Sequence, residues 1–177
     1  MSRVPMHHLA LAGIAALLAG AACSAPTGSS APIDGEKSSA SNVLPITRLR
    51  AEPYPLTTNS GIFDSVRVVI SDPAHWQQTW SDIWNRHSPE PPAPQIDFTR
   101  EMLVVAALGG RNSGGYGILV DSAYQRSDHV EVVLRKESPG ARCATTAALT
   151  QPVDVARIPV TGQAVRFRER SLVHNCS

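Results

Sequence analysis

The sequence predicts an α+β fold: a mostly antiparallel β-sheet domain with one main helix that is rich in tryptophan. From residue 61 onward, runs of β-branched and other apolar residues alternate with Pro- and Gly-containing breaks, the pattern of successive strands. One intervening segment carries all three tryptophans at a spacing of four residues, which places them on one face of a helix. The 14 prolines and 12 glycines, in a chain that is 42% hydrophobic, indicate many turns around an adequate core.

Composition limits the classes of function. A chain of 177 residues predicts one folded domain. Its formal net charge of +1 supplies no strong overall field that would select nucleic acid or an anionic membrane surface. Nucleic acid is therefore not an expected partner.

The N-terminus predicts export. Residues 1–22 contain Arg3 followed by an apolar run, and this length suits a secretory signal peptide better than a spanning helix. Small residues then precede Cys23, as in the lipoprotein cleavage box, so we expect Cys23 to be lipidated and to become the new N-terminus. Ser24, in place of an aspartate, permits sorting to the outer membrane. The alternative is ordinary signal cleavage near Ala22 or Ala25, which would leave a soluble periplasmic protein.

Residues 23–43 predict a disordered tether, because Ser, Ala, Gly and Pro dominate and almost nothing can be buried. The folded domain is expected at residues 44–177.

If Cys23 carries lipid, Cys143 and Cys176 remain, and a leftover pair in an oxidising periplasm tends to form a disulfide. Two free thiols are the alternative.

The helix is predicted from Pro73 to about Arg86. Asp72 can cap it, and Pro73 suits the first helical position. The face with Trp76, Trp80 and Trp84 is interpreted as the helix's core face, because aromatic burial dominates small cores. The alternative is an exposed aromatic platform for a sugar or a peptide.

Strands are predicted around this helix. The run at residues 102–108 is continuously apolar, which is typical of a central strand buried on both faces. In the last strand Val165 and Phe167 alternate with an arginine stripe, interpreted as a solvated outer face. The other expected strands are 61–70, 116–124, 130–135, 145–150, 153–158 and 164–170, with a turn at 138–140.

Residues 109–117, the glycine segment, hold five glycines in nine positions between two apolar runs. Glycine adopts positive φ and leaves the backbone bare, so the segment is either a tight turn or a place where another chain comes close.

The glycine segment lacks the lysine of a phosphate-binding loop and the Gly-x-Ser-x-Gly of a nucleophile elbow. Histidines are scattered, without the paired spacing of a metal site. We therefore expect neither an enzyme nor a metal or other cofactor; a site built from Ser113 with a distant His and Asp is the enzymatic alternative.

The central block resembles the C-terminal domain of PrcB-like protease complex subunits. The resemblance rests on Ile96-Asp97-Phe98, the apolar strand that follows, and the Arg-x-Ser-Gly-Gly-Tyr pattern of the glycine segment, with a Trp-containing helix before it and Thr150-Gln151-Pro152 after it. It covers roughly residues 66–167. Members of this family are typically small exported lipoproteins, and its founding members associate with a surface subtilisin-type protease and help to stabilise or mature it. The resemblance implies a binding or assembly role without catalysis.

The binding hypothesis places the partner at the glycine segment. Its candidate residues are Arg111, Asn112, Ser113, Gly114, Gly115 and Tyr116, whose backbone could meet an extended peptide while Tyr116 supplies an anchor. The expected partner is a protein, and the resemblance implies that it is a protease. The alternatives are a protease inhibitor that uses the same loop and a non-catalytic structural lipoprotein of the envelope. A purely structural hairpin, with Tyr116 packed inward, also remains open.

Overall fold

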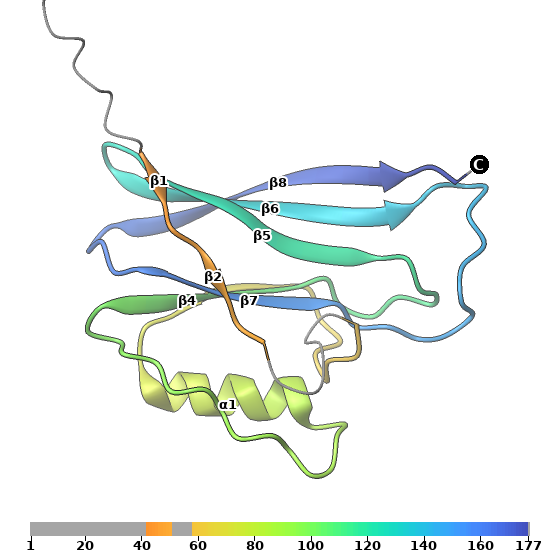
Figure 1. Cartoon of the computed structure of the whole chain (residues 1–177), viewed down its shortest axis with the longest axis horizontal. Coiled ribbons are helices and arrows are strands. Elements are labelled where there is room, and N and C mark those ends of the chain that lie inside the picture. Colours follow the sequence, from red (N-terminus) through yellow and green to blue (C-terminus); the bar gives the residue numbers. More distant parts are fainter. Residues whose placement is uncertain (1–41, 51–57, 177) are drawn as a thin grey trace, which may run out of the picture. The chain divides into compact units, whose positions relative to one another are not determined.

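A computed structural model describes residues 42–50 and 58–176 (Figure 1). The predicted signal peptide, Cys23 and almost all of the predicted tether lie outside the described residues. The elements are β1 (Val43–Leu44), β2 (Thr47–Arg48), β3 (Val66–Ile70), α1 (Pro73–Trp84), β4 (Glu101–Ala107), β5 (Gly117–Gln125), β6 (His129–Pro139), β7 (Val153–Pro159) and β8 (Ala164–His174). In this part of the chain, no helix has the length and apolar character needed to cross a bilayer.

The strands form two four-stranded sheets, ordered β1-β5-β6-β8 and β2-β7-β4-β3. The sheets face each other, and α1 covers the outer face of the second one, which makes three layers (Figure 1). Within the described residues, β6 and β8 pair in parallel and the other named strand pairs are antiparallel. The predicted α+β, mostly antiparallel fold with one Trp-rich helix is confirmed. The parallel pair arises because β7, between β6 and β8 in sequence, belongs to the other sheet.

Strand β4 is the centre of the molecule. Leu103, Val105 and Ala107 pack in the core cluster that contains the helix. Met102, Val104 and Ala106 belong to the second cluster, between the two sheets. Because side chains alternate across a strand, one continuous apolar run supplies both cores. The prediction of a strand buried on both faces is confirmed.

Helix α1 begins as predicted and ends at Trp84, two residues before the expected Arg86. The Asp72 side chain accepts a hydrogen bond from the His75 amide at 3.0 Å, and Pro73 opens the first turn. Trp76, Trp80 and Trp84 are each at most 2% exposed, so they are core residues and form no sugar-binding platform.

The Pro-rich connector at residues 88–95 packs over the tryptophans. The Trp76 indole N–H donates to the Pro94 carbonyl at 3.0 Å, and the Trp80 indole N–H donates to the Pro91 carbonyl at 2.7 Å. Proline lacks an amide donor but keeps its carbonyl acceptor. The connector therefore supplies hydrogen-bond acceptors for two buried indoles.

Two strand predictions and one turn prediction were wrong in detail. Residues 61–65 are not a strand, because Gly61 donates to Ile83 of the helix and the Phe63 carbonyl accepts from Gly110. Residues 145–150 form only an isolated bridge between Thr150 and Arg111. Strand β6 continues to Pro139, so the first two residues of the turn expected at residues 138–140 belong to the strand.

The predicted disulfide between Cys143 and Cys176 is present, with a sequence separation of 33 residues and a Cα–Cα distance of 5.0 Å. It joins the segment after β6 to the chain just beyond β8. The Gly140 amide donates to the His174 carbonyl at 2.8 Å beside it. The end of the described chain is therefore held against the sheet both covalently and by hydrogen bonds.

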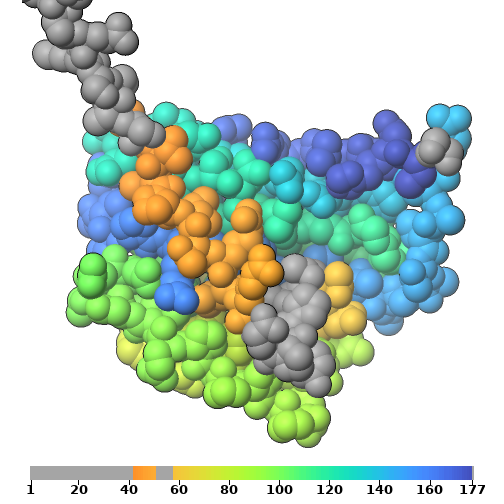
Figure 2. All heavy atoms as spheres, viewed as in Figure 1, coloured from red at the N-terminus to blue at the C-terminus, as the bar shows by residue number. Residues whose placement is uncertain are grey.

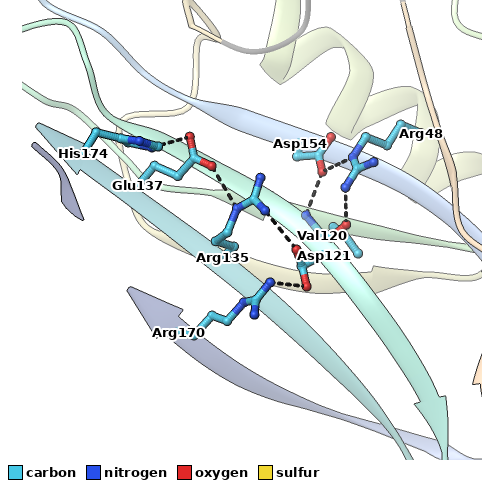
Figure 3. Close-up of polar contacts among 8 residues, drawn as sticks. All are labelled: Arg48, Val120, Asp121, Arg135, Glu137, Asp154, Arg170 and His174. Atoms are coloured by element: carbon cyan, nitrogen blue, oxygen red, sulfur yellow. Dashed lines mark hydrogen bonds and ion pairs between the residues drawn. The ribbon is translucent and has the colours of Figure 1, made fainter. Parts of the chain in front are cut away.

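A buried carboxylate links the two sheets. Asp154 on β7 is 3% exposed and accepts from the Val120 amide at 2.7 Å and from Arg48 Nε at 3.3 Å (Figure 3). Arg48 Nη2 also donates to the Val120 carbonyl at 2.7 Å. The β5–β6 register shifts between Val120 and Ser122, a β-bulge that interrupts the ladder. Asp154 and Arg48 together satisfy both backbone groups of Val120 at this bulge.

We predict a characteristic pH profile for Asp154→Asn. Burial raises the pKa of Asp154 above its ordinary 3.8, against the opposing hydrogen bond from Val120. The folded state thus binds this proton more tightly than the unfolded state, and the stability contributed by Asp154 falls as pH rises through the raised pKa. The difference between the two free energies of unfolding, wild type minus variant, should therefore increase as the pH is lowered toward 4.

Urea denaturation of both proteins between about pH 4 and 8 measures this difference. The exposed carboxylates whose pKa is lowered, such as Asp128 beside His129 and Glu131 beside Arg126, act in the opposite direction but are common to both proteins and cancel. A difference that is flat with pH, or that shrinks in acid, would contradict the prediction.

Candidate protein-interaction surface

The glycine segment starts with a close approach inside the chain. Gly109 has φ of +80°, and a Cβ on it would lie 2.9 Å from the Phe63 carbonyl oxygen. The next amide, that of Gly110, donates to the same oxygen at 2.9 Å. Glycine is needed here because β4 ends directly against the backbone of residues 63–65.

Gly109→Ala should lower the free energy of unfolding by about 1–3 kcal/mol, since the side chain adds a clash to an unfavourable φ. Gly162→Ala is the matched control: its φ is +69°, but nothing lies within 4 Å of the added Cβ. Chemical denaturation should show the larger loss at Gly109. Equal losses would mean that the close approach to Phe63 costs nothing.

The middle of the glycine segment is held by residues 143–150, which we call the lateral segment. The amides and carbonyls of Arg111 and Thr150 exchange two hydrogen bonds of 2.8 and 2.9 Å. Gly114 N donates to the Thr146 carbonyl at 2.9 Å, and the Thr150 hydroxyl donates to the Ser113 carbonyl at 3.0 Å. The lateral segment itself starts at the disulfide. The glycine segment is thus a fixed surface, built on a cross-linked support.

The segment ends at Gly115 and Tyr116. Gly115 has φ of +84° and packs against Pro139 and Thr145. Tyr116 is half-buried against the core between the sheets, and the Arg111 guanidinium carbon lies 5.8 Å from its ring centroid. Beside them is a shallow pocket of about 190 Å³, lined by Leu108, Arg111, Tyr116, Lys136, Glu137, Ser138 and Ser171.

The six predicted binding residues, which are consecutive in the sequence, are exposed unequally. Asn112 and Gly115 are exposed, whereas Arg111, Ser113, Gly114 and Tyr116 are half-buried. Several of their backbone groups are already bonded within the chain. Their role as an interface stays a prediction.

Sequence reasoning missed two neighbours of this segment. Phe63, whose carbonyl binds Gly110, is 56% exposed, and Leu149, next to Thr150, is 66% exposed. Phe63 lies in a run that reads locally as a strand, and Leu149 lies in another. No local signal marks either side chain as a surface residue, because both depend on contacts made far away in the chain. We call Phe63, Asn112, Gly115 and Leu149 the glycine-segment face.

Within the described residues, the glycine-segment face carries neither a triad at Ser113 nor a metal site. The described hydrogen bonds of Ser113 include none from its hydroxyl to a histidine or a carboxylate. Among residues 42–50 and 58–176, no group of three or more His, Cys, Asp and Glu side chains is placed to hold a metal ion.

Strands β4 to β7 match a known protein family. Residues 102–159 match the PrcB C-terminal family model. The predicted resemblance is confirmed for this PrcB C-terminal segment, which contains the glycine segment, the lateral segment and Asp154. The family indicates a role associated with a protease complex. Neither the search of curated proteins nor the search of solved structures found a match.

Proposed function

We propose that this protein is a non-catalytic binding module of a protease complex, which acts in assembly or stabilisation. The observation that carries the proposal is the glycine-segment face. Two large apolar side chains, Phe63 and Leu149, are exposed beside a fixed glycine backbone within or next to the PrcB C-terminal segment. Exposed apolar groups that flank a polar surface are the usual anchors of protein interfaces.

The rigidity of the face favours binding. A segment already ordered by hydrogen bonds to Thr146, Thr150 and Phe63 loses little conformational entropy when a partner docks. Because many of its backbone groups are already bonded, we expect recognition by side chains and shape. Asn112 offers hydrogen-bonding groups, and Gly115 adds exposed backbone.

We also propose that the protein is exported and held in the periplasm by lipid on Cys23, at the outer membrane. Arg3, the apolar run after it and the small residues before Cys23 support this. The disulfide supports it independently, because such bonds persist in oxidising compartments. Metabolic labelling with a palmitate analogue should mark the wild type but not Cys23→Ser; labelling of both proteins, or of neither, contradicts the anchor.

A photocrosslinking experiment tests the binding role. A photoreactive residue at Asn112, on the glycine-segment face, is compared in cells with one at Gln77, exposed on the outer side of α1. We expect a protease or a protein of its complex to be captured from Asn112 alone. Leu149→Asp should abolish this crosslink while leaving the fold intact, because Leu149 is a surface residue.

Equal capture from both positions, or an unchanged crosslink in Leu149→Asp, would overturn the proposed face. The assembly role is separated from inhibition by the activity of the purified complex. An assembly subunit leaves the mature protease active and raises its yield, whereas an inhibitor on the same face lowers its activity.

A further inference from the structure

Strand β8 is an open edge. Among the described residues, it pairs only with β6, through eleven residue pairs without a register shift, and it ends the strand order of its sheet. Figure 1 shows β8 along the outer border of the molecule. An edge strand leaves a row of backbone N–H and C=O groups free to pair with another chain.

Strand β8 lacks the protections that shorten or distort an edge, and it carries only charged side chains as a guard against pairing. Proteins shorten their edges, or place Pro or bulges on them, to prevent unwanted pairing. The opposite edge of the same sheet, β1, has only two residues. By contrast, β8 is long and contains no proline, and it exposes Leu172 and Val173 near its end, at 41% and 53%.

The charges along β8 favour an acidic partner. Arg166, Arg168 and Arg170 project to one side, and their side chains are 65%, 54% and 51% exposed. Each contacts a carboxylate of β5, of β6 or of the turn between them that another basic side chain also contacts. Arg170 shares Asp121 with Arg135, and Arg135 in turn shares Glu137 with His174 (Figure 3).

The other two arginines repeat this arrangement. Arg168 shares Glu131 with Arg126, and Arg166 shares Asp128 with His129. These contacts join five arginines (Arg126, Arg135, Arg166, Arg168 and Arg170) to four carboxylates (Asp121, Asp128, Glu131 and Glu137), so the carboxylates do not fully neutralise the arginines. Each guanidinium has five N–H donors, and these contacts leave some of them for a partner.

We propose that β8 binds an extended, acidic segment of a partner protein by strand addition. Main-chain hydrogen bonds would supply the pairing, and acidic side chains at every second position would stand opposite the three arginines. Residues directly opposite on paired strands lie about 5 Å apart, so such pairs are within salt-bridge reach. This inference goes beyond the proposed function, because it concerns a different surface and a stated chemistry of partner.

A second copy of this chain is a poor occupant. Residues opposite each other in paired strands point to the same face, so pairing β8 with itself sets the arginine row against its own copy. Like charges placed directly opposite are destabilising. The same row that attracts an acidic strand thus opposes self-association.

The test uses purified protein and a capped ten-residue peptide in which Glu alternates with Val and Thr. Fluorescence anisotropy measures its Kd, and amide hydrogen exchange reports protection of β8. The comparison variants are Arg168→Glu and Arg126→Glu. Both remove a contact to the same Glu131, but only Arg168 lies on β8. A peptide with the same side chains and alternate N-methylated amides tests the main-chain pairing.

We expect the peptide to slow amide exchange in β8. Arg168→Glu should weaken binding about tenfold, Arg126→Glu by less than about twofold, and N-methylation should abolish it. Equal effects of the two substitutions, retained binding of the N-methylated peptide, or no binding overturns the proposal. So does a β8-paired dimer in sedimentation. None of these outcomes bears on the crosslink at Asn112, since the peptide experiment contains no protease.

Discussion

Trp80→Ala should lower the free energy of unfolding by about 3–5 kcal/mol, the typical cost of truncating a buried aromatic side chain. Trp80 is 1% exposed and stands between Trp76 and Trp84, with ring centroids 5.2 and 5.7 Å away. Its removal leaves a cavity between the helix and the sheet and orphans the Pro91 carbonyl. Urea denaturation followed by circular dichroism measures the loss.

Two further variants serve as comparisons for Trp80→Ala. Trp80→Phe keeps an aromatic ring in the core, so it should cost clearly less than the alanine variant. Leu149→Ala, on the exposed lateral segment, should change stability by no more than about 0.5 kcal/mol. If Trp80→Ala cost no more than Leu149→Ala, the helix would not be part of the core.

Removal of the disulfide, by Cys143→Ser together with Cys176→Ser, should lower the free energy of unfolding by about 3–4 kcal/mol. The bond closes a loop of 33 residues that includes the lateral segment, β7 and β8. Opening it frees the unfolded chain and loosens the support of the glycine segment. Denaturant titrations of the wild type and the variant measure the difference.

A reductant provides the control for this prediction. It should destabilise the wild type by about the same amount and leave the double-serine variant unchanged. Equal stability of the oxidised wild type and the variant would contradict the prediction. Faster amide exchange at Gly114 in the variant would show that the loss reaches the glycine segment, because that amide donates to Thr146 of the lateral segment.

The elements predicted correctly are those whose signals are local. The apolar run from Met102 to Leu108 fixes a two-sided strand, because no polar residue interrupts it. Asp72, Pro73 and the spacing of the tryptophans fix the helix and its buried face. The disulfide followed from the pairing of two leftover cysteines, which needs no three-dimensional information.

The wrong or missed features depend on distant contacts. Residues 145–150 have no intrinsic preference strong enough to form a strand, and their conformation is set by pairing with Arg111 and Gly114. The parallel β6–β8 pair depends on β7 joining the other sheet. Asp154 is one of two charged residues in a mostly apolar strand, and only the three-dimensional structure shows that it binds the Val120 amide at the bulge. The exposure of Phe63 and Leu149 could not be predicted from the sequence, because it too depends on distant contacts.

The path of residues 42–50 has a mechanical consequence. This short stretch pairs with β5 through β1 and with β7 through β2, so it belongs to both sheets in turn, and Figure 2 shows it in orange on the surface of the molecule. Arg48 then fastens it to Val120 in one sheet and to Asp154 in the other (Figure 3). Tension applied from the N-terminal side must therefore be carried by two sheets and a partly buried ion pair before it reaches the rest of the domain. Residues 43–48 therefore hold this end of the described domain against separation from either sheet.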